Sequence, residues 1–433
     1  MKSETSQRSF PEGGGGPRPP APRVAILGGG PIGLEAALAA TEVGLPFRLY
    51  EAGPTVGTNI REWGHVRLFT PWAQSVSPRM RRHLRCAGIE LPASEDACPT
   101  GRELVERALE PVAALSTVAP SLETGIRVVS VGREGLLKHE AIGSPERAGR
   151  PFRLLVETGR GRRVERADVV LDCTGSWGHP HPVGDGGIPA PGEERLGQRL
   201  VQRIPDFAAE TDAWAGQTVL LIGAGHSAQT AVRDLSRLAE SRPGTRVIWA
   251  LRRTEPDWSV DPEDPLPARA GLTREARALA RGASPAVEIR LGATVEAFES
   301  RERGPVEVTL RSVDGTGEIR DRESRELETL HVDRILALTG SVGDASLYRQ
   351  LQVHECYATS GPMKLAAALL ADGSGDCLDQ TSHGIEALKS PEPSFYILGS
   401  KSYGRNNTFL LRVGWEQVDE VFSELTDETA SEG

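Results

Sequence analysis

Gly28-Gly29-Gly30-Pro31-Ile32-Gly33 is the stretch that decides the fold of this 433-residue chain. It has G-x-G-x-x-G spacing, follows the apolar run 24–27 and opens a helix-like run over residues 34–43. In that setting the first glycine makes a tight turn, the second lets the backbone approach a pyrophosphate, and the third allows close helix–strand packing. The helix N-terminus then faces the phosphates. The stretch therefore predicts a dinucleotide-binding βαβ unit.

The same spacing recurs later in the chain, in Gly223-Ala224-Gly225-His226-Ser227-Ala228. This second stretch follows the apolar run 218–222 and opens a helix-like run over residues 229–238. One such match alone is a weak signal, but two with the correct flanks predict that one chain holds two nucleotides.

The residues after the next strand of each unit differ. Glu51 ends the extended run 47–50, close to the spacing of roughly 20 residues expected of an acid that binds ribose hydroxyls. The second unit has Leu251-Arg252-Arg253 there and no acid. A 2′-phosphate needs cations at this place, whereas a bare ribose prefers a carboxylate. Arg252 and Arg253 therefore favour NADPH over NADH, the alternative being that Glu51 and the arginines are ordinary surface residues.

An internal repeat connects the two units. Residues 167–175 and 332–340 both contain an Asp, an apolar strand pattern and a closing Thr-Gly. Further extended runs are expected at residues 126–131, 152–157, 287–291 and 306–310. A repeat of this kind indicates two copies of one supersecondary plan. The predicted fold class is α/β, with two Rossmann-like three-layer dinucleotide-binding domains, each carrying a small antiparallel β excursion.

The expected domain organisation has five parts. A Gly- and Pro-rich disordered leader covers residues 1–22, and the first domain begins at residue 23 and runs to 205. The second domain covers residues 214–340. The chain then returns to the first domain over residues 341–427, where 395–399 has a buried-strand pattern and 410–425 a helix pattern. Residues 428–433 form a tail.

Composition excludes several function classes. The 60 acidic and 50 basic residues give a net charge of −10, which disfavours a general nucleic-acid binder. Because no apolar run approaches about 18 residues, a membrane span is not expected. The five cysteines include no C-x-x-C pair, and with no export signal they indicate reduced thiols and a cytoplasmic location. The histidines show no metal-ligand spacing, so no metal site is expected.

This layout resembles the two-dinucleotide-binding-domain flavoproteins, which include thioredoxin reductases, flavin-containing monooxygenases and bacillithiol-disulfide-reductase-like proteins. The resemblance covers nearly all of the chain after residue 22. It implies that the first turn holds FAD, in a domain made of residues 23–205 and 341–427, and that the second turn holds NADPH or, less favoured, NADH. The implied FAD-binding residues are Gly28, Gly30, Pro31, Ile32, Gly33, Glu51, Thr174, Gly175 and Gly399. The implied nicotinamide-dinucleotide-binding residues are Gly223, Gly225, His226, Ser227, Ala228, Arg252 and Arg253.

The chain departs from its relatives near the end of the flavin domain. Many relatives have Gly-Asp where this sequence has Gly399-Ser400. The polar stretch that follows, Lys401-Ser402-Tyr403-Gly404-Arg405-Asn406-Asn407, is expected either to contact the flavin pyrophosphate or a substrate, or to form a solvated loop.

Three reactions are open to a flavin reduced by NADPH: reduction of a disulfide, reduction of a quinone, or oxygenation of a small molecule with O₂. The missing C-x-x-C disfavours transfer through a resident dithiol, and Cys173, in the crossover strand, is expected to be structural. Cys356, close to His354, is either a lone reactive thiol or a structural cysteine. The fingerprint of flavin-containing monooxygenases does not match residues 200–207. A monooxygenase-like enzyme is nevertheless the leading hypothesis, and the alternatives are a disulfide or quinone reductase and a non-catalytic redox or nucleotide sensor.

The active-site lining is sought in residues 63–72. Alternation there places Trp63, His65, Arg67 and Phe69 on one face of an expected strand. Aromatic residues there could wall the flavin, Arg67 could hold an anionic substrate, and His65 could transfer a proton. The alternative is a half-buried structural strand. Further candidates with the same alternative are Trp177, His179 and the stretch Asp257-Trp258-Ser259. The expected partner is a small-molecule substrate, and the sequence is compatible with an oligomer.

Overall fold

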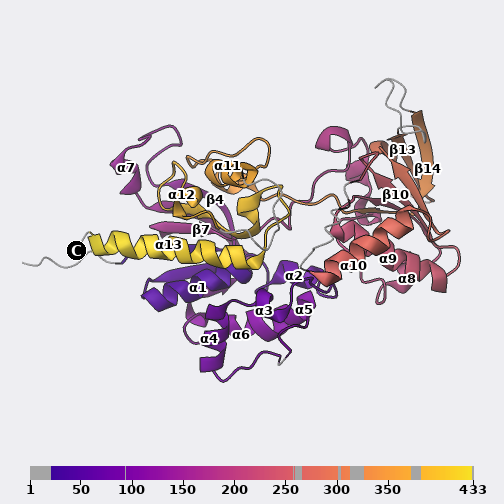
Figure 1. Cartoon of the computed structure of the whole chain (residues 1–433). Coiled ribbons are helices and arrows are strands. Elements are labelled where there is room, and N and C mark those ends of the chain that lie inside the picture. Colours follow the sequence, from indigo (N-terminus) through magenta and orange to yellow (C-terminus); the bar gives the residue numbers. More distant parts are fainter. Residues whose placement is uncertain are drawn as a thin grey trace, which may run out of the picture.

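The fold is built on two parallel sheets, which lie in two lobes of the molecule (Figure 1). The computed structural model describes residues 21–92, 94–256, 258, 266–300, 304–312, 326–371 and 382–431. Most of the expected leader, and part of the stretch Asp257-Trp258-Ser259, lie outside these residues. Within the described part of the chain, no helix is long and apolar enough to cross a membrane, and no acidic, histidine and cysteine side chains cluster as a metal site would require.

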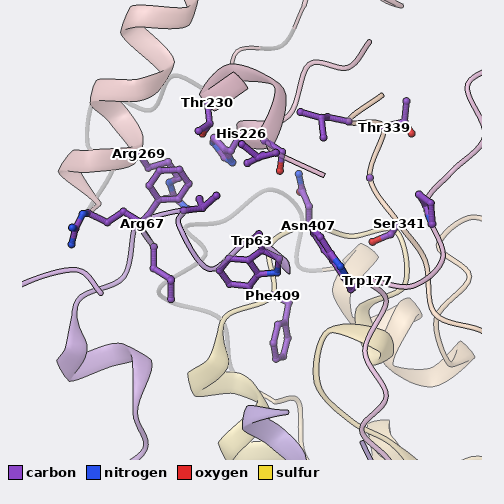
Figure 2. Close-up of a pocket in the computed structure, with 18 of the residues that line it drawn as sticks. Trp63, Arg67, Trp177, His226, Thr230, Arg269, Thr339, Ser341, Asn407 and Phe409 are labelled. Atoms are coloured by element: carbon purple, nitrogen blue, oxygen red, sulfur yellow. The ribbon is translucent and has the colours of Figure 1, made fainter. Parts of the chain in front are cut away.

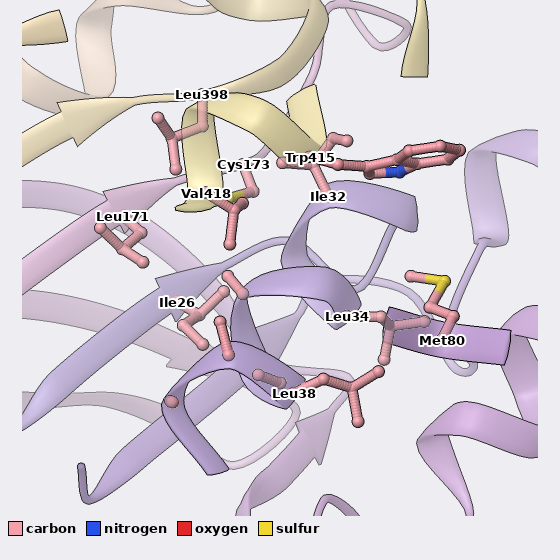
Figure 3. Close-up of a cluster of buried hydrophobic side chains, with 14 of the residues drawn as sticks. Ile26, Ile32, Leu34, Leu38, Met80, Leu171, Cys173, Leu398, Trp415 and Val418 are labelled. Carbon is pink, nitrogen blue, oxygen red and sulfur yellow. The ribbon is translucent and has the colours of Figure 1, made fainter. Parts of the chain in front are cut away.

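The first sheet has five parallel strands in the order β16-β7-β1-β2-β3. Their bounds are β1 Val24–Leu27, β2 Phe47–Glu51, β3 Leu122–Thr124, β7 Val169–Asp172 and β16 Phe395–Ile397. Helices α1 (Pro31–Val43) and α13 (Leu411–Ser431) pack on one face, in a core that Figure 3 shows in part. An antiparallel sheet of β4 (Arg127–Arg133), β5 (Phe152–Thr158) and β6 (Gly161–Ala167) covers the other face.

Strand β1 shows why this sheet is buried on both faces. Val24 and Ile26 belong to the core under the helices, whereas Ala25 and Leu27 belong to the core under the antiparallel sheet. Successive strand side chains point to opposite faces, so an uninterrupted apolar run is what a doubly covered strand requires.

The second sheet repeats the plan, in the order β11-β10-β9-β15-β8. Its bounds are β8 Leu200–Val201, β9 Thr218–Ile222, β10 Arg246–Leu251, β11 Val287–Leu291 and β15 Arg334–Ala337. Helices α9 (His226–Ser241) and α10 (Pro267–Ala280) and the short α8 (Thr211–Trp214) cover one face. The antiparallel strands β12 (Thr294–Glu299), β13 (Val306–Ser312) and β14 (Glu326–Val332) cover the other.

Short helices connect the larger elements. Between β2 and β3 lie α2 Thr58–Glu62, α3 Trp72–Ser75, α4 Pro78–Cys86, α5 Gly101–Leu104, a π-helical turn Val105–Leu109 and α6 Glu110–Ala113. Elsewhere the chain forms α7 Pro145–Ala148, α11 Met363–Ala371 and α12 Ile385–Leu388. The 3₁₀ turns are Ala119–Ser121, Asp185–Gly187, Glu193–Arg195, Gly197–Arg199, Ala345–Tyr348 and Gly399–Tyr403.

The two segments that join the lobes run antiparallel to each other. The His181 amide donates to the Gly340 carbonyl at 2.9 Å, and the Val342 amide donates to the His179 carbonyl at 3.1 Å. The outgoing and returning connections therefore form a short paired ribbon where the lobes meet.

The predicted fold class is confirmed: two parallel sheets, each with helices on one face and an antiparallel excursion on the other. The helix expected over residues 410–425 is α13, which continues to Ser431, beyond the expected domain end at 427. The strand expected around residues 63–69 does not form, because α2 occupies Thr58–Glu62 and the chain then turns. The domain boundaries themselves stay a prediction.

Candidate functional site between the two lobes

The first glycine turn is closed at its outer positions and open at its centre. Gly28 has a φ of +102°, and a Cβ there would lie 2.6 Å from the Cys173 carbonyl oxygen. A Cβ at Gly33 would lie 1.9 Å from the Gly28 oxygen, whereas nothing lies within 4 Å of one at Gly30. The protein thus fills the space beside two glycines and leaves free the one that a pyrophosphate would approach.

The helix after this turn begins without a side-chain cap. Gly30 is the N-cap of α1, and Pro31, Ile32 and Gly33 follow it in the first turn. By contrast, Ser77 caps α4 and Thr100 caps α5 with a capping box. Because the first amides of a helix have no partner within it, the uncapped α1 presents N–H groups and a partial positive charge to an anion.

Glu51 is held beside this turn by the backbone. Its carboxylate accepts hydrogen bonds from the amides of Gly29 at 2.7 Å and Gly53 at 2.6 Å. Since a carboxylate offers about four acceptor sites, two remain for hydroxyl donors. Half-buried at the end of β2, Glu51 has the chemistry and the position of a ribose-binding acid.

The second turn has the same geometry, with an alanine in place of the third glycine. Gly223 has a φ of +130°, and a Cβ there would lie 2.3 Å from the Leu338 carbonyl oxygen. Nothing lies within 4 Å of a Cβ at Gly225, and α9 also begins without a side-chain cap. The third small residue is Ala228, which is fully buried. Half-buried His226 and exposed Ser227 form the start of α9.

The strand end beside the second turn lacks an acid. Leu27 is in register with Tyr50, and Ile222 is in register with Ala250, so Leu251 occupies the position of Glu51. Leu251 is buried, and the exposed Arg252 and Arg253 follow it. This end of the site is therefore cationic and matches a phosphorylated ribose better than a bare one.

Both lobes line a cavity of about 450 Å³ (Figure 2). Its walls come from the segment after α2, the paired connections, the start of α9, the end of β15, the start of α10 and the segment before α13. The lining residues are Trp63, Val66, Arg67, Leu68, Phe69, Thr70, Trp177, Pro180, Gln202, Ile204, His226, Ser227, Thr230, Leu266, Arg269, Ala337, Leu338, Thr339, Gly340, Ser341, Asn407, Phe409 and Leu410.

Only some of the expected catalytic residues line this cavity. Trp63 and Arg67 line it, together with Phe69, but His65 does not. The proposed single strand face was wrong: residues 63–65 form a turn, and Arg67 makes only an isolated bridge with Thr100. His65 is half-buried, and its Nε2 atom has no hydrogen-bond partner among the described residues.

Aromatic contacts join the cavity walls across the two lobes. Trp177 lies 6.3 Å from Trp63 between ring centroids, and its indole N–H donates to Glu62 at 2.9 Å. Phe69 meets His226, at the start of α9, with centroids 5.5 Å apart. The first lobe thus contacts the mouth of the second glycine turn. His179, by contrast, is exposed and outside the lining, and its Nε2 atom lies 3.7 Å from the Asp344 carboxylate. Trp258, another candidate, packs edge-on against Trp249.

The segment after Gly399 is buried at its start. Lys401 forms an ion pair with Asp172 at 2.6 Å and donates to Thr174 Oγ1 at 3.1 Å and to the Asp344 carbonyl at 2.9 Å. The solvated-loop alternative is therefore wrong for Lys401, while Asn407 lies in the cavity wall. Ser400 is next to Gly175, whose Cβ position is 3.6 Å from the Ser400 hydroxyl.

No described cysteine lines the cavity. Burial raises the pKa of the Cys173 thiol, which lies in the crossover. Hydrogen bonds from the Thr359 backbone and side chain lower the pKa of Cys356, which is in a tight turn away from the lining. Cys377 lies outside the described residues.

Arg269 and Phe409 line the cavity although no sequence pattern singles them out. Arg269 is on α10, for which no helix was expected, and the only signal for Phe409 was its place just before an amphipathic helix. Both reach the cavity through the packing of segments distant in sequence, which no local pattern reveals.

Comparison with known proteins identifies the fold. Neither a family model nor a curated sequence matches the chain. Among solved structures, the bacillithiol disulfide reductase of Bacillus cereus is similar with a TM-score of 0.67 and 19% identity, over 94% of this chain and 99% of that one. The thioredoxin reductase of T. acidophilum has a TM-score of 0.54 and 14% identity, over 93% and 97%. The ornithine N-hydroxylase of Kutzneria sp. 744, solved with reduced FAD, NADP⁺ and L-ornithine, has a TM-score of 0.59 and 16% identity, over 94% and 100%.

Proposed function

From the fold that these three proteins share with this chain, we propose that the chain is an NADPH-dependent FAD oxidoreductase that oxygenates a small organic molecule. One observation carries the proposal: two glycine turns, each with an open central glycine and an uncapped helix, belong to two lobes that share one aromatic-walled cavity.

The residues present fit both dinucleotides. FAD would lie on Gly30, Pro31 and Ile32, with Glu51 accepting its ribose hydroxyls. NADPH would lie on Gly225, His226 and Ser227, with Arg252 and Arg253 beside its 2′-phosphate. FAD bound in this way supplies hydride acceptance from NADPH and electron delivery to the final acceptor.

The chain's own residues position the reactants and exclude water. Trp63, Phe69 and Phe409 provide apolar walls, and a dry cavity strengthens every electrostatic interaction inside it. Arg67 is the side chain best placed to orient a substrate, because its guanidinium is fixed by a hydrogen bond to the Cys98 carbonyl.

The cavity's composition favours oxygenation over disulfide reduction. No described cysteine lines it, so the described walls hold no dithiol through which electrons could pass. In the oxygenation, NADPH, a proton, O₂ and substrate give NADP⁺, water and a product that carries one added oxygen atom.

The test begins with the purified full-length protein. We expect a yellow protein with a flavin band near ~450 nm that NADPH bleaches under argon. After air is admitted, a substrate panel is screened for oxygen consumption without release of hydrogen peroxide. Oxygen transferred to a substrate in proportion to NADPH oxidised supports the proposal.

Other outcomes identify the alternatives. Anaerobic NADPH oxidation with a quinone or disulfide, and none coupled to oxygenation, would make the chain a reductase. A bound flavin that neither NADPH nor NADH bleaches would indicate a redox or nucleotide sensor.

A further inference from the structure

We infer that the cavity between the lobes takes a flat, apolar substrate with an anionic group and discriminates against amines. The inference names the substrate class of the proposed oxidoreductase and rests on that function only for turnover. Binding at the cavity can be measured without turnover.

The walls that would hold the body of such a substrate are aromatic. Trp63 and Trp177 are inclined at 55° with centroids 6.3 Å apart, and Phe69 and Phe409 also border the cavity. Aliphatic side chains such as Leu266 and Leu410 fill much of the remaining wall. Aromatic walls bury flat rings well, and favourable ring pairs add about 0.5–1.5 kcal/mol beyond burial.

The charges at the cavity are of one sign. Among the described lining residues none is acidic, and the two that carry a full charge are Arg67 and Arg269. Figure 2 shows both arginines on the same side of the cavity, away from Thr339 and Ser341. An anion at that side would meet guanidinium groups. An ammonium group would meet like charges, and no described lining residue offers it a carboxylate.

Arg67 is the better placed of the two arginines. One of its nitrogens donates to the Cys98 carbonyl, and Glu103 is 4.0 Å from it, so the head group has a fixed position. Its side chain is 62% exposed, which leaves donors for a ligand. The planar guanidinium has five N–H donors and binds a carboxylate through two parallel hydrogen bonds.

This arrangement separates the chain from a relative with the same fold. The ornithine N-hydroxylase was solved with L-ornithine, a substrate with two amino groups. A carboxylate is the strongest partner for an ammonium group, and the described walls of this cavity offer none. The shared fold therefore does not imply a shared substrate.

The test uses the FAD-loaded protein with NADP⁺ and three indole probes of similar size: indole-3-acetate, neutral indole-3-acetamide and cationic tryptamine. Isothermal titration calorimetry gives each Kd. We expect indole-3-acetate to bind at least ~10-fold more tightly than the amide, which is about 1.4 kcal/mol, and tryptamine to bind most weakly. Arg67→Gln should remove the preference for the anion over the amide and leave amide binding unchanged.

The control is Arg85→Gln, on the exposed surface of α4, which should leave all three Kd values unchanged. Flavin content and the circular dichroism spectrum confirm that both variants are folded. Equal binding of tryptamine and indole-3-acetate would overturn the inference, as would an Arg67→Gln variant that keeps the anion preference.

A third result overturns the inference and spares the proposed function: NADPH bleaches the flavin, but none of the probes binds, because the cofactors fill the cavity. If instead the protein holds no flavin, the proposed function fails, and the same titration on the flavin-free protein still decides the substrate class.

Discussion

The two glycine turns of this chain share one backbone conformation and differ in the side chains around it. In each, the first glycine lies against a crossover carbonyl, that of Cys173 or Leu338, and the central glycine is open. Three differences at equivalent positions matter most: Gly33 against Ala228, Glu51 against Leu251, and Asp172 against Ala337. The last pair follows from the registers of β7 and β15.

These differences give the two copies of the turn different properties. We propose that the repeated backbone makes room for a dinucleotide in each lobe and that the side chains at the strand ends select the ribose. Asp172 turns the first crossover into a buried ionic anchor, whereas Ala337 leaves the second crossover free to line the cavity. The following predictions break these differences one at a time.

The largest effect is expected at the first crossover. Lys401→Met leaves Asp172 as a buried carboxylate without its cation, and we expect unfolding to become easier by about 3–5 kcal/mol. Both side chains are almost fully buried, so water cannot replace the lost ammonium group. Urea unfolding of the full chain measures the change. Lys364→Met, which removes an exposed lysine 3.6 Å from Glu386, is the matched control and should cost under ~0.5 kcal/mol. An equal loss of unfolding free energy in both variants would contradict a stabilising role for the buried ion pair of Lys401 and Asp172.

The next effect concerns the third position of each turn. Gly33→Ala places a Cβ 1.9 Å from the Gly28 oxygen, so α1 must move away from β1. We expect a cost of about 1–3 kcal/mol and loss of flavin from the purified protein. The reciprocal change, Ala228→Gly, should cost about 1 kcal/mol at most and leave NADPH binding in place. Flavin absorbance per chain and the KM for NADPH read out the two sites. Full flavin occupancy in Gly33→Ala would contradict the packing argument.

The strand-end difference is tested by removing its charge. Arg252→Ala combined with Arg253→Ala should raise the KM for NADPH about 10- to 100-fold, since each charge-assisted hydrogen bond is worth about 1.5–3 kcal/mol when fully formed. The KM for NADH should change less than ~2-fold, because NADH lacks the 2′-phosphate. Initial rates of coenzyme oxidation at varied coenzyme concentration give both KM values. Arg281→Ala, at the exposed end of α10, serves as the control. Equal changes for both coenzymes would remove the argument for NADPH.

The sequence predicted the parts of this fold that depend on local pattern. The apolar strands, the two turns and the crossover repeat are all periodic or closely spaced, so neighbouring residues determine them. Strand β6 was missed because its side chains are mostly exposed and three of its seven residues are arginine. The cavity was only half predicted: Trp63 and Arg67 reach it, but the alternation that included His65 assumed a strand where the chain turns after α2. Arg269 and Phe409 join the site only through packing of segments distant in sequence.

The smallest effect concerns the polar contacts between each turn's helix and the helix packed beside it. Hydrogen bonds from Arg79, Arg82 and His83 on α4 outweigh the effect of burial and lower the pKa of Glu42 on α1 from 4.5 to about 2. The second helix, α9, is tied to α10 by a neutral hydrogen bond from Thr273 to Gln229, at 3.1 Å.

A carboxyl whose pKa is lower in the folded state stabilises the protein fully above its unfolded pKa, and this stabilisation is lost as pH falls towards the folded value. Glu42→Gln should therefore cost about 1 kcal/mol at pH 7 and progressively less between about pH 4.5 and pH 2. Thr273→Val removes the neutral bond and should cost the same at every pH. Urea unfolding of the wild type and both variants at neutral and acidic pH gives these differences. If the loss of unfolding free energy in Glu42→Gln does not change with pH, then the contact of α1 with α4 is not more dependent on charge than that of α9 with α10.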